Sequence, residues 1–373
     1  MRILGIETSC DETAAAVVET TGDQSRPWAV VSSVIASQAD IHREWGGVVP
    51  EIASRQHLAD ICGVVEGALA QAGVGANEID AVAVTQGPGL VGSLLVGVSF
   101  AKAFAAARDL PVIAVHHLAG HIESLVLEHG EMPLPAVILV VSGGHTSLYF
   151  VPERGSYLLV GQTRDDAAGE AYDKVAKLLG LGYPGGPIVD KLAAEGRDTA
   201  VKLPLPRFTH ADRNDAPSDL KAGEFPPHIR HMAEFSFSGL KSAAVRLIDK
   251  DGPGNVADFC ASFQRVVVGT LVKRLFDVAN ALSAKSVGIA GGVSANRRLR
   301  HDAIERGKRE GMPVFVPALS LSTDNAAMIA AAGLRRLSQH GPASLDFNAH
   351  ASMPIAGIDA DLRSENPNPT RDA

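Results

Sequence analysis

The sequence has few residues that could cross-link it and no segment suited to anchoring it in a membrane. Its three cysteines, Cys10, Cys62 and Cys260, form no Cys-X-X-Cys pair and are too widely spaced for a disulfide framework, which favours a reducing compartment. No run of about 18 uncharged apolar residues occurs, so we expect no transmembrane helix. The apolar run after Met1 ends at Glu7 without the cleavage site of a signal peptide. These features predict a soluble cytoplasmic protein with no membrane partner.

Positive charge is also scarce. The 373 residues include 34 Lys and Arg against 42 Asp and Glu, which gives a net charge of −8. Nucleic-acid-binding proteins are usually basic, so this balance argues against a general one, although a local basic patch or a basic partner subunit stays possible. Hydrophobic residues make up 46%, and a chain of this length and composition predicts a globular protein of two domains.

Short apolar runs are arranged in the same way in both halves of the chain. Residues 2–6 and 14–18 flank a polar turn in the first half, and residues 136–141 and 146–151 do so in the second. Each pair predicts two strands joined by a hairpin, and each half continues with a strand, a glycine loop and a helix. Further strands are expected at 30–36, 79–84, 112–115, 287–290 and 314–316, and helices at 52–71, 93–107, from about 296, and at 324–337. The pattern predicts an α/β fold with an internal duplication.

Two segments depart from this pattern. Residues 197–232 are rich in Pro, Asp, Arg and His, which predicts a surface insertion that is ordered only in part. The tail from Gly357 is polar and rich in Pro, and we expect it to be flexible.

Two histidines at helical spacing form a candidate metal site. His117 and His121 stand at i and i+4 after a predicted strand, so on a helix their imidazoles share a face and could bind one ion. Two ordinary histidines near a helix N-terminus would show the same spacing. A zincin-type metalloprotease needs Glu directly after the first His, and this sequence has Leu118 there. The spacing leaves both interpretations open and disfavours that type of protease.

Asp324 opens the last predicted helix. It could be an N-cap or first-turn carboxylate and nothing more. If the two halves pack as a duplicated pair, however, Asp324 could join the two histidines. A site of two histidines and one carboxylate with open positions suits Fe²⁺, and Zn²⁺ is an alternative.

Glycine-rich turns recur along the chain. They are Gly87–Ser93, Ser142–Thr146, Tyr183–Pro187 and Gly291–Asn296, and we predict that each follows a strand at one sheet edge. A single turn of this kind is usually just a turn, and none has the spacing of a Walker A or GxGxxG loop. Together, their backbone N–H groups predict a nucleotide cradle in a cleft between the two halves.

Several charged residues accompany these turns. Asp11 and Glu12 lie in the first hairpin turn, and Asp173 lies inside the predicted helix GEAYDKVAKLL. Acidic residues in a first helical turn are ordinary capping. Asp173 is deeper in its helix than capping requires, so a ribose or phosphate–metal contact is an alternative.

Taken together, the motifs resemble one family closely. The matching segments are GIETSCDET, GGVVPEIASRQH, TQGPGLVGSL, VHHLAGH, VSGGHT, DDAAGEAYDKVAKLLGLGYPGG, FSFSGLK, GGVSANRRLR and STDNAAMIA. They occur in order from Gly5 to Ala330 and resemble the TsaD family of tRNA adenosine threonylcarbamoyltransferases. The resemblance implies two ribonuclease-H-like lobes, similar to those of actin, sugar kinases and heat-shock ATPases, with a nucleotide cleft between them. On this reading the N-terminal lobe is 1–115 and the C-terminal lobe is 116–356, with the last helix packed back on the first lobe.

The resemblance also implies a reaction and its residues. The reaction is transfer of threonylcarbamoyl from threonylcarbamoyl-AMP to the exocyclic amine of the adenosine 3′ of the anticodon, in tRNAs that read codons beginning with A. His117, His121 and Asp324 match the family's ligands for iron or zinc, and Asp11 matches an acid proposed to assist the chemistry. The positions that match the adenylate site are Val140, Val141, Ser142, Gly143, Gly144, Asp173, Gly186, Asp190 and Asn296.

The family's partners are a paralogous TsaB-type subunit and a TsaE-type P-loop ATPase, and the acidic charge of this chain fits reliance on partners for tRNA binding. Two positions depart from the common pattern: Ala119 stands where Glu is frequent, and Ser322 stands where Cys is frequent. A small-molecule kinase of the same superfamily is the first alternative function. It would need Mg²⁺ and a base beside a substrate hydroxyl rather than paired histidines. A metalloprotease and an actin-like scaffold are the others.

Overall fold

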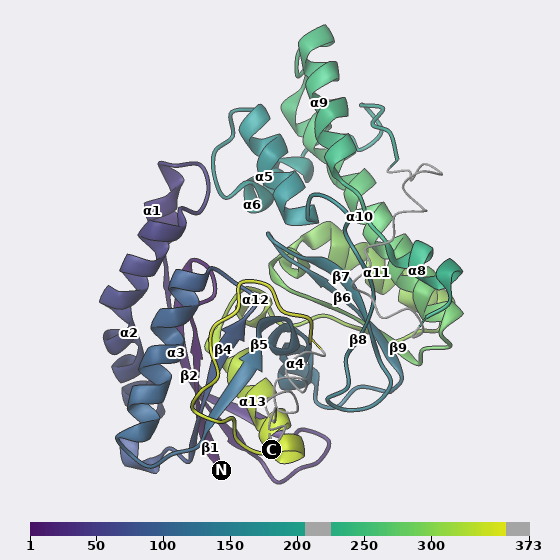
Figure 1. Ribbon diagram of the computed structural model, residues 1–373. Helices are drawn as coiled ribbons and strands as arrows, with labels where there is room; N and C mark the ends of the chain where they lie inside the picture. Colours follow the sequence, from purple (N-terminus) through teal and green to yellow (C-terminus); the bar gives the residue numbers. More distant parts are fainter. Residues whose placement is uncertain (206–224, 356–373) are drawn as a thin grey trace, which may run out of the picture.

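Two mixed β-sheets form the framework of the molecule. The computed structural model describes residues 1–205 and 225–355 and places helices on both faces of each sheet (Figure 1). The first sheet contains β1 (Arg2–Glu7), β2 (Glu12–Thr20), β3 (Trp28–Ser37), β4 (Ala81–Gly87) and β5 (Val112–His116). The second contains β6 (Ala136–Val141), β7 (Thr146–Val151), β8 (Leu158–Gln162), β9 (Ser286–Ala290) and β10 (Val314–Phe315).

The two sheets have the same topology. Their strand orders are β3-β2-β1-β4-β5 and β10-β9-β6-β7-β8. In the first sheet β1 pairs antiparallel with β2 and parallel with β4, and in the second β6 pairs antiparallel with β7 and parallel with β9. The predicted α/β class and the internal duplication are therefore confirmed, as is the hairpin that each half begins with.

The helices divide between the sheets. They are α1 (Ala39–Arg43), α2 (Pro50–Ala72), α3 (Val91–Ala106), α4 (His117–His129), α5 (Ala168–Leu178), α6 (Gly185–Ala193), α8 (Pro227–Ala233), α9 (Ser238–Asp251), α10 (Val256–Ala281), α11 (Arg297–Glu310), α12 (Leu319–Ser322) and α13 (Ala326–His340). Helices α2 and α3 cover one face of the first sheet, and α13 covers the other. None of the helices in the two described ranges is both long and apolar enough to cross a bilayer.

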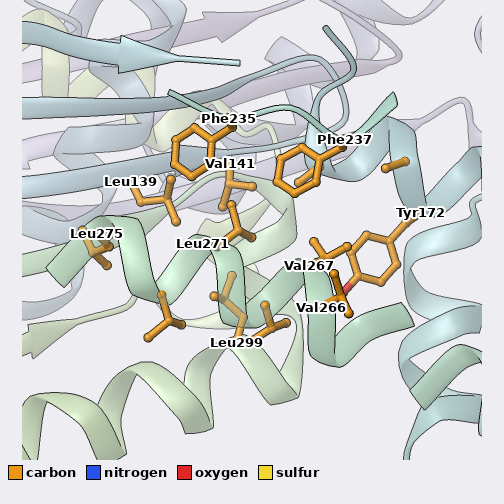
Figure 2. Close-up of a cluster of buried hydrophobic side chains, with 14 of the residues drawn as sticks. Leu139, Val141, Tyr172, Phe235, Phe237, Val266, Val267, Leu271, Leu275 and Leu299 are labelled. Atoms are coloured by element: carbon orange, nitrogen blue, oxygen red, sulfur yellow. The ribbon is translucent and has the colours of Figure 1, made fainter. Parts of the chain in front are cut away.

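Helix α10 is the centre of the core on the second sheet. Its Val267, Leu271 and Leu275 pack near Leu139 and Val141 of β6, as Figure 2 shows. The sequence analysis did not predict α10. Apolar residues lie around most of its circumference, so they do not form the single stripe that marks an amphipathic helix.

Helices α4 and α13 lie against each other between the two sheets. Leu118, Ile122 and Leu125 of α4 pack on the second sheet, whereas α13 packs on the first. Near the other end of the pair, the Arg335 guanidinium of α13 donates to both carboxylate oxygens of Glu123 of α4, at 3.1 and 3.0 Å. Both side chains are buried, and a bidentate pair of this kind fixes the relative position of two elements.

Some expectations need correction. The turn Tyr183–Pro187 does not follow a strand; it joins α5 to α6. In the predicted surface insertion, residues 206–224 lie outside the described part of the chain. Its described flanks are largely exposed, but Leu203, Phe225 and Ile229 are buried in the hydrophobic core on the second sheet. The tail from Gly357 also lies outside the described residues, and the division into two domains stays a prediction.

Close packing seats α13 directly on the backbone of β1. A Cβ built on Gly5 would lie 2.2 Å from the Ala326 carbonyl oxygen and 2.9 Å from the Ala330 Cβ. No larger residue fits between this strand and this helix. Glycine at position 5 therefore sets how closely the start of α13 approaches the first sheet.

We predict that Gly5→Ala lowers the free energy of unfolding by about 1–3 kcal/mol, because the new methyl group overlaps a backbone oxygen that moves only if α13 moves. Gly63→Ala is the matched control. Gly63 is exposed on α2 with nothing within 4 Å of a built Cβ. Alanine there should raise stability by about 0.5–1 kcal/mol. Urea unfolding measures both changes, and an unchanged midpoint for Gly5→Ala would contradict the direct contact.

Candidate functional site

Three side chains from distant parts of the chain meet where α4 and α13 begin. His117 and His121 lie on the first turns of α4, directly after β5, with their ring centroids 4.7 Å apart. Asp324 lies in the short connection between α12 and α13. Its Oδ1 lies 3.6 Å from Nε2 of His117 and 3.2 Å from Nε2 of His121. One possible ligand atom from each residue lies within 4.8 Å of the other two, a spacing that one metal ion could occupy.

The structure also shows which residue caps α13. Asn325 is the N-cap, and its side chain accepts a hydrogen bond from the Met328 N–H at 2.9 Å. Asp324 therefore does not cap the helix, and its carboxylate is directed to the histidines instead. The choice between a cap and a ligand, which the sequence left open, is settled against the cap.

Burial and charge act in opposite directions at this cluster. Burial alone would lower the pKa of His117, but the carboxylates of Asp324 and Glu7 raise it to about 9. Burial would raise the pKa of Asp324, but the imidazoles of His117 and His121 hold it well below its usual range. The site is therefore arranged for an ionised carboxylate facing positive charge, which a divalent cation would supply.

His121 provides the test of whether the residues fit a metal. It is fully buried, and neither ring nitrogen has a hydrogen-bond partner of good geometry within the described residues. Nε2 lies 3.2 Å from Asp324 without hydrogen-bond alignment, and because buried polar atoms are nearly always satisfied, this arrangement leaves room for a further partner such as a cation. Two histidines and one carboxylate are a donor set for Fe²⁺ or Zn²⁺.

His116 precedes the cluster but is not part of it. It caps α4 by accepting from the Leu118 N–H at 3.1 Å, and its Nε2 donates to the Met353 carbonyl oxygen at 3.0 Å. Burial lowers the pKa of His116 to about 3, so this imidazole is neutral. Both of its nitrogens are engaged, which gives it a structural role.

The glycine turn after β6 lies beside the metal cluster. Ser142 closes the turn, since its N–H donates to the His145 carbonyl oxygen at 2.8 Å. The His145 ring centroid lies 6.3 Å from that of His117. Gly143 and Gly144 are exposed, and a Cβ on either would meet nothing within 4 Å. Their backbones are open to a ligand, whereas the side chains of Val140 and Val141 are fully buried in the sheet.

Asp173 has a structural contact of its own. Its Oδ1 accepts a hydrogen bond from the Gly185 N–H at 2.7 Å, which holds the start of α6 against α5. Burial raises the pKa of Asp173, and the negative charge of Asp11 adds to this rise. Asp11, in the turn after β1, is therefore within electrostatic range of a carboxylate on α5. Gly186 follows in the same turn and has open space around it.

Asp190 and Asn296 are joined by a residue that the sequence analysis missed. Gln264 of α10 donates to Asp190 at 3.2 Å and accepts from Asn296 at 2.9 Å. Arg297 also binds Asp190, with Nε 2.9 Å from Oδ2. Asp190, Gln264 and Arg297 line a cavity of about 600 Å³. Gln264 could not be singled out from sequence, because it lies inside a buried helix with no motif of its own.

The comparison with protein families decides what this site belongs to. The family model described as TsaD, tRNA N6-adenosine threonylcarbamoyltransferase, matches residues 29–331. The chain belongs to the TsaD family. The matched range includes His117, His121 and Asp324, together with every position expected in the adenylate site, whereas Asp11 precedes it.

Curated relatives agree with this membership. A tRNA N6-adenosine threonylcarbamoyltransferase of Syntrophomonas wolfei is 48% identical over 94% of this chain and 97% of its own. One from Anaeromyxobacter sp. strain Fw109-5 is 49% identical over 94% of this chain and 98% of its own. The enzyme class expected from the resemblance, a transferase, is thereby confirmed.

Solved structures with the same fold are much more distant in sequence. The similarity to full-length HypF in its phosphate- and nucleotide-bound form has a TM-score of 0.56 at 14% identity. It covers 92% of this chain and 47% of the HypF chain. The similarity to component A of (R)-2-hydroxyglutaryl-CoA dehydratase from Acidaminococcus fermentans has a TM-score of 0.51 at 12% identity. It covers 91% of this chain and 100% of the component A chain. These similarities bear on the fold alone.

The two departures from the TsaD pattern have simple structural places. Ala119 is buried and packs with α13 on the first sheet. Ser322 is buried at the end of α12, where its Oγ accepts from the Arg300 guanidinium at 3.0 Å and donates to the Ala318 carbonyl oxygen at 3.0 Å. Neither residue occupies a position among the three candidate ligands.

We predict that His121→Ala abolishes stoichiometric binding of iron or zinc, because it removes one of the three candidate ligands. His129→Ala is the matched control. It lies on the same helix, and its ring contacts the Val316 carbonyl oxygen rather than the cluster. Elemental analysis after dialysis against either metal measures the difference. Equal metal content in the two variants would contradict the assignment of His121.

Proposed function

We propose that this chain transfers the threonylcarbamoyl group from threonylcarbamoyl-AMP to the exocyclic amine of the adenosine 3′ of the anticodon, in tRNAs that read codons beginning with A. The observation that carries the proposal is the meeting of His117, His121 and Asp324 beside the open glycine turn, within a chain of the TsaD family.

The reaction is a direct acyl transfer. The adenosine amine attacks the carbamoyl carbon, the bond from that carbon to the phosphate oxygen breaks, and AMP leaves with the electron pair. The amine loses one proton, which Asp11 could accept from its turn facing the second lobe. Ser9 Oγ lies 3.2 Å from Nδ1 of His117, but that nitrogen also contacts the Glu7 carboxylate and the ring belongs to the candidate metal site, so we propose that no acyl-enzyme forms.

Because the adenosine amine is a weak nucleophile, we expect much of the rate acceleration to come from positioning the amine against the carbamoyl carbon. The exposed N–H groups of Gly143 and Gly144 can donate to oxygens on which negative charge develops. Asp190 and Asn296, linked through Gln264 beside the cavity, are suited to holding the nucleoside end of the donor. The adenylate would then lie across the second lobe with its reactive end toward α4.

The metal belongs to the same proposal. His117, His121 and Asp324 would hold one Fe²⁺ per chain, with Zn²⁺ as the alternative. A bound divalent cation supplies Lewis acidity, which polarises a carbonyl or phosphoryl oxygen. Chemistry of this kind needs an open coordination position, and three protein ligands leave one.

The partners are proposed from the family and the charge. The chain carries a net charge of −8, which disfavours unaided binding of a polyanion. A TsaB-type paralogue and a TsaE-type P-loop ATPase would therefore act with it, and one of them would contribute to the tRNA-binding surface.

The test is incorporation of radiolabelled threonine into unmodified tRNA. The wild-type protein, with both partner proteins and threonylcarbamoyl-AMP, should label the tRNA, and His117→Ala/His121→Ala should lower the rate by at least about 100-fold if the metal supplies several kcal/mol. The control variant His129→Ala should retain the wild-type rate.

Each other outcome is informative. If the double variant still labels tRNA, the proposed function stands and the assignment of His117 and His121 as metal ligands needed for it is wrong. No labelling by a wild-type protein that binds the nucleotide would contradict the proposed function and favour a kinase or scaffold.

A further inference from the structure

His117 lies between two carboxylates. Its Nε2 faces Asp324, with Oδ1 3.6 Å away, and its Nδ1 faces Glu7, with Oε2 3.1 Å away. Glu7 is the last residue of β1, is fully buried, and is separated from His117 by 110 positions in the chain. It is not among the three candidate ligands. One side of the imidazole therefore faces the metal cluster, and the other side faces a buried acid.

The Glu7 carboxylate is held in place independently of His117. Thr85 of the neighbouring strand β4 donates its hydroxyl proton to Oε2 at 2.7 Å. The backbone N–H of Ser9 donates to the other oxygen, Oε1, at 2.5 Å. Both donors belong to the first sheet and its turn, so the orientation of the carboxylate is fixed by the sheet.

A buried carboxylate is costly unless it is paired. Within the described residues, His117 provides the only cationic group ion-paired with Glu7. An apolar residue could fill this position in the core with no such cost. The presence of Glu7 therefore points to a requirement at His117 rather than to stability.

We propose that Glu7 is a positioning residue that presents His117 to the metal. This rests on the proposed metal site. A histidine that binds a metal is neutral, and in that form the hydrogen bond to the Glu7 carboxylate keeps the one proton on Nδ1 and leaves the lone pair on Nε2, toward Asp324. Carboxylates behind metal-binding histidines commonly fix the tautomer and the ring orientation in this way.

His121 makes the dependence on Glu7 sharper. Its Nδ1 has no hydrogen-bond partner of good geometry within the described residues, so no acceptor orients that ring. His117 is consequently the candidate ligand whose ring is oriented by a hydrogen bond to a carboxylate, and we expect the affinity of the cluster for a metal to depend on that contact. The last position of β1 thus connects the first sheet to a ligand on α4.

Glu7→Gln is the informative substitution, because an amide cannot satisfy all the donors. The Ser9 N–H is fixed and takes the amide oxygen. The amide NH₂ then takes the place of Oε2 and faces Nδ1 of His117. Two N–H donors therefore face each other where the carboxylate oxygen accepted a hydrogen bond. The proton on Nδ1 then has the neutral Ser9 hydroxyl, 3.2 Å away, as an acceptor in place of the carboxylate, so the tautomer with a free Nε2 is less favoured.

The experiment measures zinc affinity by competition with a chromophoric chelator at one neutral pH. Glu7→Gln should raise the dissociation constant about 10- to 100-fold. Glu234→Gln is the matched control, because Glu234 is also buried but pairs with Arg164 at 2.7 Å. It should bind zinc as the wild type does. Equal affinity for Glu7→Gln and the wild type, or no zinc binding by the wild type, would overturn the proposal.

A second measurement separates positioning from general damage. In the zinc-loaded wild type, ¹⁵N-histidine NMR should show a protonated Nδ1 and a zinc-bound Nε2 for His117. Glu7→Asp, which keeps the charge but shortens the side chain, should bind zinc more tightly than Glu7→Gln. Zinc bound through Nδ1 would overturn the proposal. None of these readouts uses tRNA, so failure of threonine transfer leaves the outcome for Glu7 intact.

Discussion

The contact between α4 and α13 is the constraint on which the site depends. Helix α4 packs Leu118, Ile122 and Leu125 on the second sheet and Ala119 on the first, where α13 also packs. The meeting of the two helices brings together candidate ligands more than 200 positions apart in the chain. Glycine at position 5 lets α13 lie directly on β1, and the buried pair of Glu123 and Arg335 fixes the two helices along their length. The candidate metal cluster thus depends on how the duplicated halves pack.

The electrostatics of the cluster follow from that packing. The turn after β1 brings acidic residues beside Asp324, and the pKa of Glu12 is raised by burial and then by the charges of Asp324 and Asp11. Carboxylates confined in this way repel one another. A divalent cation between His117, His121 and Asp324 would lower that repulsion, which is a physical reason for a cation to bind there.

Much of this was predictable from the sequence, because strands and glycine turns are local features. The hairpins, the duplication and the helical spacing of His117 and His121 followed from periodicity. The place of Asp324 did not, since the sequence does not tell a helix cap from another first-turn carboxylate, and only the structure shows that Asn325 caps the helix. Glu7 and Gln264 act through contacts between distant segments, which no spacing rule encodes. Helix α10 was missed because it is apolar on most sides.

The most direct test is diffraction from crystals of the metal-loaded protein on both sides of the iron and zinc absorption edges. The account predicts one anomalous peak bonded to His117, His121 and Asp324, about 2.0–2.2 Å from a nitrogen or oxygen of each. A metal bound elsewhere would contradict it. So would an empty cluster at saturating metal, with the ring of His121 hydrogen-bonded to protein groups.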